Sequence, residues 1–256
     1  MITLAITNQK GGVGKTTSCI NLAAELGSMG YSVLVVDVDP QGNCTSGLGI
    51  DATSLDVTLY DLLLDGAQSD EVVTRTQWEG VSILPANIDL AGAEVELAGA
   101  ISRETRLHRG LSRLPNYDIA IIDCPPSLGI LTINALVAAD KLLIPIQCEY
   151  YALEGVGQLT RTVTLLKNYL NPGLQVNGVL LTMYDSRTRL SSEVADEVRN
   201  QFKSQVFNTI IPRNIRLAEA PSFAMPIGYY DPQSTGARAY REFAREVAEK
   251  WLSTEH

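Results

Sequence analysis

Short apolar runs rich in Val, Ile and Leu alternate along the chain with longer segments whose apolar residues recur at a helical period. Because these runs have no polar face, they predict strands buried on both sides, as in a parallel sheet covered by helices. The expected strands are residues 2–7, 32–36, 81–84, 119–122, 142–146, 176–181 and 209–211, of which only the last lacks the pattern of burial on both sides. The expected helices are residues 16–29, 58–64, 90–100, 103–114, 130–138, 153–169, 191–203 and 236–252. The fold class predicted is α/β, with a mostly parallel twisted sheet and helices on both faces.

Composition narrows the class of protein. The 256 residues contain no linker-like segment, so we expect a single domain over 1–256. With 45% hydrophobic and 19% charged residues, the chain is typical of a globular protein and not of a disordered or coiled-coil one. Its four cysteines form no CxxC pair, which argues against a disulfide framework or a zinc cluster. No apolar run approaches the roughly 18 residues of a membrane span, and no signal peptide is evident, so we expect a cytoplasmic protein.

Charge is unevenly distributed along the chain. The net charge is −9, yet residues 1–100 hold 3 basic and 13 acidic side chains, whereas residues 101–256 hold 17 and 16. An acidic protein is not expected to bind nucleic acid over its whole surface. Residues 185–216, with six basic and four acidic side chains, form a modest basic segment, and Arg103, Arg106, Arg109 and Arg113 form a second basic stripe that a solvated surface explains better.

A glycine-rich loop follows the first expected strand and opens the first expected helix. It reads Lys10-Gly11-Gly12-Val13-Gly14-Lys15-Thr16-Thr17. Glycines let such a loop bring its N–H groups around an anion, and the helix N-terminus adds positive potential. Lys15 is expected to reach the β- and γ-phosphates of a nucleotide, and the Thr16 hydroxyl to ligate Mg²⁺. The sequence therefore predicts a P-loop NTPase that binds ATP and Mg²⁺.

Carboxylates follow two other expected strands. Asp37 and Asp39 end the second strand, where the alternation of an extended chain directs both toward the same side and thus toward the phosphate loop. Asp123 ends the strand at 119–122 in a Walker B arrangement, and we expect it to hold Mg²⁺ through water. Thr16, Asp39 and Asp123 are the candidate metal residues. An aspartate that merely caps the next helix is the plainer alternative for Asp123.

The phosphate loop departs from the ordinary pattern, because Gln9 stands where the first glycine belongs and Lys10 adds a second lysine. In this it resembles the deviant Walker A loop of the ParA/MinD family of ATPases. The resemblance implies that Lys10 crosses a dimer interface to the phosphates of the partner's nucleotide, where it would act like an arginine finger. It also implies that Asp39 positions the attacking water and that Asp37 has an accessory role.

Later segments extend the resemblance, toward chromosome-partitioning ParA proteins of the Soj type, over nearly the whole chain. They are residues 147–155, 181–185, 210–222 and 230–232. The resemblance implies an adenine pocket containing Pro212, Asn214 and, with a weaker case, Met183, although these could equally be ordinary loop residues. It also implies that Arg187 and Arg216 contact DNA phosphates without reading sequence. Taken from the residues alone, a solvated basic surface explains both arginines equally well.

The function implied is an ATP-dependent switch with weak ATPase activity that forms a homodimer in the ATP state. It would bind double-stranded DNA non-specifically, associate with the nucleoid, and segregate chromosome or plasmid DNA with a ParB-type centromere-binding partner. Stable membrane association is not expected, because the last helix mixes Arg238, Arg241 and Arg245 with Glu242, Glu246 and Glu249 and so lacks a strongly basic face. Three alternatives stay open: a MinD-like membrane-positioning ATPase, a ParA-like ATPase that positions a non-DNA cargo, and a metabolic P-loop synthetase.

Overall fold

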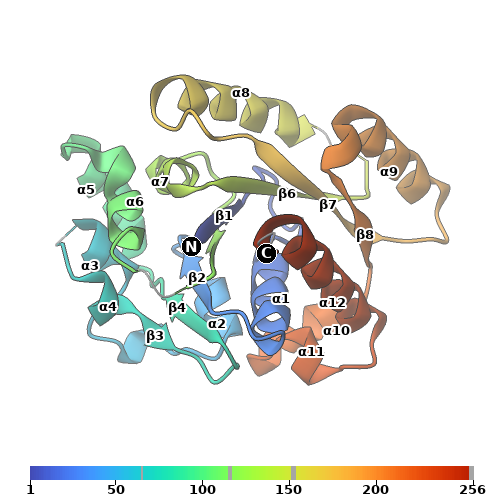
Figure 1. The fold of residues 1–256 in the computed structure, drawn as a ribbon, viewed down its shortest axis with the longest axis horizontal. Coiled ribbons are helices and arrows are strands. Elements are labelled where there is room, and N and C mark those ends of the chain that lie inside the picture. The colour runs from blue at the N-terminus through green and yellow to red at the C-terminus, as the bar shows by residue number, and fades with distance from the viewer. Residues whose placement is uncertain (65, 115–116, 151–153, 254–256) are drawn as a thin grey trace.

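The computed structural model describes residues 1–64, 66–114, 117–150 and 154–253, and within them one eight-stranded sheet forms the centre of the molecule (Figure 1). The strand order is β3-β4-β2-β5-β1-β6-β7-β8. All neighbours pair in parallel except β3 and β4, which are antiparallel. The strands are β1 (Ile2–Ile6), β2 (Val33–Asp37), β3 (Thr74–Arg75), β4 (Val81–Leu84), β5 (Ile119–Asp123), β6 (Lys141–Gln147), β7 (Val176–Tyr184) and β8 (Val206–Pro212).

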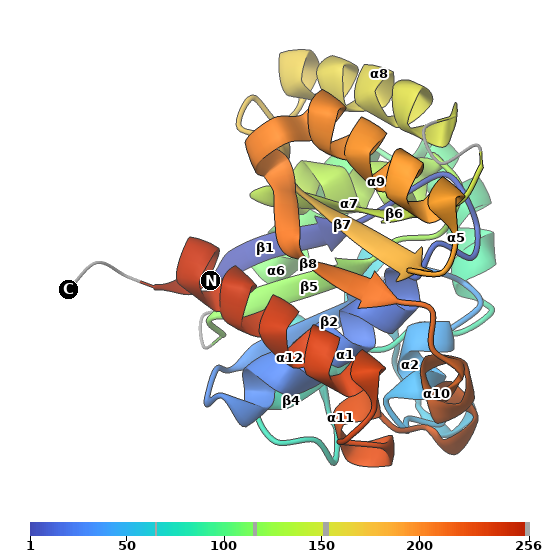
Figure 2. The same ribbon diagram turned by 90° about the vertical axis from the view of Figure 1, so that its right-hand side faces the viewer.

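Helices cover both faces of the sheet, and each face has its own apolar core. One core receives side chains from α3 (Leu59–Leu64), α4 (Ser69–Val72), α5 (Leu90–Glu96), α6 (Arg106–Leu111), α7 (Ile130–Ala138), α8 (Glu154–Tyr169) and α9 (Arg189–Phe202). The other receives them from α1 (Lys15–Ser28), α2 (Asn43–Gly47), α10 (Ile215–Glu219), α11 (Ile227–Tyr230) and α12 (Thr235–Val247). Figure 2 shows α12 lying alongside α1. The predicted α/β class, with helices on both faces, is confirmed.

The seven predicted strands are all present, with ends shifted by a few residues. The residues predicted as helix 90–100 form α5 and a 3₁₀ turn, Leu97–Gly99, and the residues predicted as helix 103–114 form a 3₁₀ turn, Arg103–Thr105, before α6. The predicted helix start at residue 153 lies outside the described residues. The edge strand β3 and the helices α2, α4, α10 and α11 were not predicted, because segments of two to five residues are too short to show a period.

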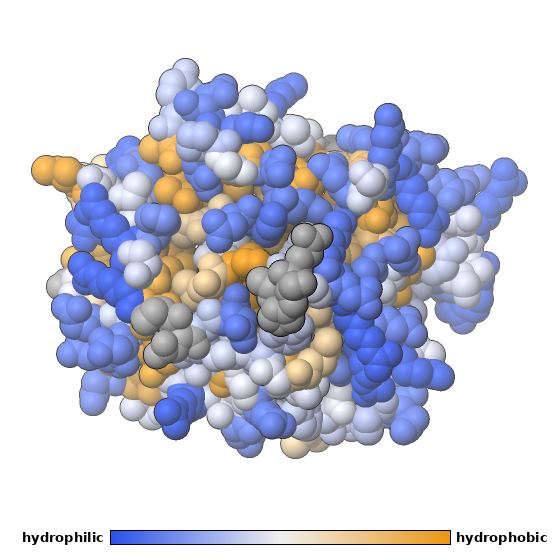
Figure 3. All heavy atoms as spheres, viewed as in Figure 1, coloured by the Kyte–Doolittle hydropathy of each residue, from blue (hydrophilic) through white to orange (hydrophobic). Residues whose placement is uncertain are grey.

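The C-terminal helix α12 is docked on the sheet. Tyr240, Phe243 and Val247 are fully buried, and Phe207 of β8 makes edge-to-face contacts with Phe243 and with Trp251. The apolar stripe of this helix is therefore used inside the molecule. On the face shown in Figure 3 hydrophilic side chains predominate, and in the described part of the chain no helix has the length and apolar character that crossing a membrane would require.

Candidate functional site

The phosphate loop connects β1 to α1 at the carboxyl edge of the sheet. Gly12 has a φ of +72° and Gly14, the N-cap of α1, a φ of +90°, conformations that residues with a Cβ rarely adopt. A Cβ built on Gly11 or Gly12 would meet no atom within 4 Å, so the backbone borders open space. That space is a cavity of about 690 Å³, lined among others by Gly11, Gly12, Gly14, Lys15, Thr16, Thr17 and Asp39. Val13 is buried beneath it, and its carbonyl accepts a hydrogen bond from Thr182 Oγ1 of β7 at 2.8 Å.

The two lysines of this loop have different environments. Lys15 is only 7% exposed, lines the cavity, and donates from Nζ to the carbonyl of Lys10 at 3.3 Å. Burial lowers the pKa of Lys15, and the charges of Asp123, Cys124 and Asp39 oppose that shift. Lys10 is half-buried, is not among the residues that line the cavity, and its ammonium has no hydrogen bond or ion pair within the described residues.

Asp123 at the end of β5 is completely buried, and neither carboxylate oxygen has a hydrogen-bond partner among the residues that the structure describes. Burial raises the pKa of Asp123 well above its usual range, and the Asp37 carboxylate raises it further. The Thr16 hydroxyl and the Lys15 ammonium act in the opposite direction. A buried carboxylate without donors is costly unless a cation balances it.

The donors at this edge fit a magnesium ion. Mg²⁺ prefers oxygen ligands and keeps several of its waters. A hydroxyl, Thr16, and a carboxylate, Asp39, line the cavity; the Thr16 hydroxyl lowers the pKa of Asp123, and the negative charge of Asp39 raises it. The unpartnered oxygens of Asp123 are the strongest structural indication, since a hydrated cation would supply the missing donors.

Only one of the two strand-end aspartates of β2 lines the phosphate cavity. Asp39 does so, and its Oδ1 accepts from the Gln41 N–H at 3.0 Å. Asp37 is fully buried and its Oδ2 accepts from the backbone N–H and the hydroxyl of Thr45. Of the two carboxylates expected to converge on the phosphate loop, Asp39 lines the cavity, whereas Asp37 is held by α2 and, like Asp123, is not among the lining residues. The alternation rule does not apply beyond Asp37, where the strand ends.

A second cavity of about 250 Å³ adjoins the first and shares Gly14, Thr17 and Met183 with it. The predicted base-pocket residues Met183, Pro212 and Asn214 all line this second cavity. Met183 has a φ of +51°, an uncommon conformation for a residue with a side chain. Both ends of the Asn214 amide are already engaged, because Oδ1 accepts from the Arg216 N–H at 2.8 Å and Nδ2 donates to Thr235 Oγ1 at 2.7 Å.

Two further residues of this cavity were missed by sequence reasoning. Thr182 connects β7 to the phosphate loop, and Tyr240 of α12 lies at hydrogen-bond distance, 3.0 Å, from the Ser18 hydroxyl of α1. The strand that precedes Met183 could have indicated Thr182. No local pattern could have indicated Tyr240, because its contacts cross 222 positions of the chain.

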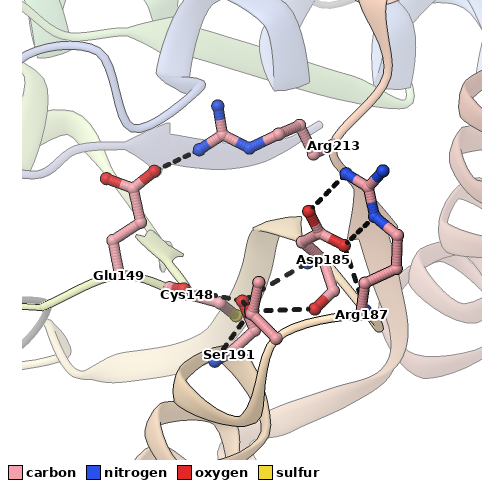
Figure 4. Close-up of polar contacts among 7 residues, drawn as sticks. Cys148, Glu149, Asp185, Arg187, Ser191 and Arg213 are labelled. Atoms are coloured by element: carbon pink, nitrogen blue, oxygen red, sulfur yellow. Dashed lines mark hydrogen bonds and ion pairs between the residues drawn. The ribbon is translucent and has the colours of Figure 1, made fainter.

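The two candidate DNA-contacting arginines are both paired with carboxylates. Arg187 forms a bidentate ion pair with Asp185, shown in Figure 4, and this contact lowers the pKa of Asp185. Arg216 pairs with Glu219 at 2.8 Å and with Asp231 at 3.5 Å.

The same close-up shows how the segments after β6 and β8 and the helix α9 are joined. Arg213, after β8, pairs with Glu149, after β6. Ser191 of α9 donates to the carbonyl of Cys148 at 3.1 Å. The basic segment is thus partly neutralised by carboxylates within this chain.

The fold and the site together define a P-loop nucleotide-binding α/β protein with a second lysine in its loop. A family model described as "AAA domain" matches residues 1–176. The sporulation initiation inhibitor protein Soj of Bacillus subtilis is 55% identical over 96% of this chain and 97% of its own length. The chromosome partitioning protein ParA of Myxococcus xanthus is 52% identical over 96% of this chain and 88% of its own length. The chain belongs to the ParA/Soj family of chromosome-partitioning ATPases.

A solved structure is also similar over the full length. The crystal structure of cobyrinic acid a,c-diamide synthase from Mycobacterium smegmatis with a bound ATP analogue and magnesium superimposes with a TM-score of 0.87. Its sequence is 42% identical, and the match covers 99% of this chain and 96% of that one. The predicted family and fold are confirmed by these comparisons, whereas the roles of individual residues stay predictions.

Proposed function

We propose that this chain is a Mg²⁺-dependent ATPase that dimerises around ATP, binds DNA without sequence preference in that state, and is reset by hydrolysis. With a ParB-type partner bound to a centromere-like site, it would segregate chromosome or plasmid DNA and associate with the nucleoid. The name of its relative from M. xanthus, a chromosome partitioning protein, supports partitioning as the process.

The observation that carries the dimer proposal is the contrast between the two lysines. Lys15 lines the cavity of its own chain and is bonded to the loop, so it can neutralise phosphate charge there. Lys10 does not line that cavity, and its ammonium makes no polar contact within the described residues. A cation that does not serve its own site is available to a second subunit, and this would make nucleotide state and oligomeric state one equilibrium.

The other site residues would have separate roles at the phosphates. The N–H groups of the loop from Gly11 to Thr17 would bind the phosphate oxygens, and Thr16 and Asp123 would hold Mg²⁺, which neutralises phosphate charge when bound. Asp39 would orient the attacking water. Phosphoryl transfer depends mainly on positioning and charge stabilisation, so this carboxylate need not take the proton completely.

Arg187 and Arg216 are our candidates for DNA contact. Each is paired with a carboxylate, so a DNA phosphate would have to compete for the guanidinium. Exposed ion pairs of this kind are weak, and a polyanion that releases counterions can displace them. Two subunits would double the positive charge presented to DNA.

A metabolic synthase is the second candidate function, favoured by the 42% identical synthase structure. The two candidates differ in what stimulates turnover. We expect non-specific double-stranded DNA and a ParB-type partner to raise the ATPase rate of the wild-type protein, and Lys15→Ala to abolish ATP binding. An ATPase rate that depends on a small-molecule acceptor and does not change with DNA would favour the synthase. Flotation with anionic vesicles in ATP would favour a MinD-like role instead.

A further inference from the structure

Thr45, in the short helix α2, is buried, and both its backbone N–H and its hydroxyl make hydrogen bonds. It is 1% exposed, and its backbone N–H and hydroxyl donate to Asp37 Oδ2 at 2.8 and 2.7 Å. The same hydroxyl oxygen accepts from the backbone N–H of Ala86, after β4, at 3.0 Å. A hydroxyl has one proton, so donation to the carboxylate and acceptance from the amide fix its orientation.

Asp37 transmits this contact toward the candidate catalytic carboxylate. Its second oxygen, Oδ1, accepts from the backbone N–H of Asp39 at 3.2 Å. The peptide of Asp39 is further fixed by Gly42, whose N–H donates to the Asp39 carbonyl at 2.9 Å. A continuous series of hydrogen bonds therefore runs from Ala86 through Thr45 and Asp37 to the residue that lines the phosphate cavity.

We propose that Thr45 is a positioning residue for ATP hydrolysis, which holds the Asp37 carboxylate and through it the backbone and side-chain orientation of Asp39. The proposal rests on the proposed function, in which Asp39 orients the attacking water. Thr45 itself does not line the phosphate cavity, so it acts through Asp37 and not on the nucleotide. Its neighbour Ser46 does line the cavity, which places α2 as a whole against the site.

Loss of the hydroxyl has a specific consequence. In a Thr45→Val protein, the Asp37 carboxylate keeps two of its three hydrogen-bond donors. The Ala86 N–H loses its acceptor, and because both Asp37 and Ala86 are buried, water does not replace the lost bonds. The Asp37 carboxylate can then rotate, and the Asp39 peptide that depends on it becomes less well ordered. Small errors in the placement of a reacting group lower the rate of the chemical step more than they lower binding. We expect kcat to fall about tenfold, equivalent to about 1.4 kcal/mol, with KM for ATP unchanged within about threefold.

The chain offers a matched control in Thr58, at the start of α3. Thr58 is also buried, and its N–H and hydroxyl both donate to one carboxylate oxygen, Asp61 Oδ2, at 2.7 and 3.3 Å. It lines neither of the two nucleotide-site cavities. Thr58→Val thus removes a similar hydrogen bond with no route to Asp39. It should lower the melting temperature without lowering kcat.

The experiment measures steady-state ATP hydrolysis and thermal melting for wild type, Thr45→Val, Thr45→Ser and Thr58→Val. Thr45→Ser retains the hydroxyl and should stay within about twofold of the wild-type kcat. The proposal is overturned if Thr45→Val keeps the wild-type kcat, if its loss appears in KM alone, or if Thr58→Val loses kcat to the same extent.

Asp37→Asn covers the case in which Thr45→Val does not fold, because it removes a buried charge without changing shape. It too should lose about tenfold in kcat at an unchanged KM, and a wild-type kcat would overturn the proposal. Hydrolysis by the wild-type protein distinguishes failure of the proposed ATPase function from failure of the positioning role of Thr45. Without any hydrolysis the proposed function fails, whereas wild-type hydrolysis with fully active Thr45→Val and Asp37→Asn proteins refutes only the role of Thr45.

Discussion

Replacing Asp123 with asparagine should stabilise the protein in the absence of ligands and destroy its response to magnesium nucleotide. Both oxygens of Asp123 are buried, and neither has a hydrogen-bond donor within residues 1–64, 66–114, 117–150 and 154–253. Asp37 is its in-register neighbour on β2, and the Lys15 ammonium is attracted to the charges of Asp123 and Asp39. Asparagine removes one of these negative charges while keeping the shape of the side chain.

The magnitude follows from the cost of leaving a buried polar group unsatisfied, which is about 1–3 kcal/mol and more for a charge. Because the asparagine amide also lacks partners and Lys15 loses an attraction, we expect a net gain of about 1–2 kcal/mol from the same range. For a chain of this size each kcal/mol changes the melting temperature by about 2–4 °C. Melting in EDTA without nucleotide should therefore occur a few degrees higher for Asp123→Asn than for the wild type.

With Mg²⁺ and a non-hydrolysable ATP analogue, the wild type should instead melt at a higher temperature than Asp123→Asn. Ligand at 100 times its Kd stabilises a protein by about 2.7 kcal/mol, and the variant should lose most of this increment. Asp140→Asn is the control, since Asp140 is exposed and already accepts from the Thr3 N–H at 2.8 Å; this substitution should give no stabilisation in EDTA and an intact nucleotide response. If Asp123→Asn melts below the wild type in EDTA and keeps the full magnesium-dependent shift, then Asp123 is an ordinary structural residue and our reasoning is refuted.

Three further predictions concern the DNA surface and the core. Arg216→Glu should weaken retention of non-specific DNA at low salt without changing nucleotide binding. The slope of log K against log salt concentration should fall by about 1 per lost phosphate contact. Arg109→Glu on α6 is the charge-matched control, and equal DNA retention by the two variants would refute the assignment of Arg216 to DNA contact. Phe243→Ala should cost about 3–5 kcal/mol in urea unfolding because the ring is fully buried against Phe207, and a loss below about 1 kcal/mol would contradict that packing. Tyr240→Phe removes the hydroxyl contact with Ser18 and should cost about 1 kcal/mol by the same measurement, whereas a neutral result would mean that the contact contributes nothing.

The sheet and its large helices could be predicted because their signals are local. Apolar runs such as residues 119–122 are buried on both faces, and each ends where the chain reaches the carboxyl edge of the sheet. The phosphate loop could also be predicted from local sequence, since Gly12 and Gly14 have positive φ values that residues with a Cβ rarely adopt. Tertiary packing did not have to be known for either.

The parts that could not be predicted depend on contacts between distant segments. Asp37 and Asp39 look alike in the sequence, but the backbone N–H and the hydroxyl of Thr45, in the unpredicted helix α2, hold Asp37, whereas Asp39 lines the phosphate cavity. Asn214 was expected at a base pocket, and it lines one, but its amide also caps α10 and bonds to Thr235, 21 positions away. The ion pair of Arg216 with the more distant Asp231 likewise became evident only in the folded chain.

The central claim is that Lys10 of each subunit acts at the nucleotide of its partner. It is tested most directly by the mass of the ATP-bound protein in solution. Sedimentation velocity should be measured for wild type and Lys10→Ala with a non-hydrolysable ATP analogue and Mg²⁺, together with analogue binding. We predict that the wild type sediments as a dimer, and that Lys10→Ala binds the analogue yet stays a monomer. A Lys10→Ala protein that binds the analogue and dimerises like the wild type would contradict the account.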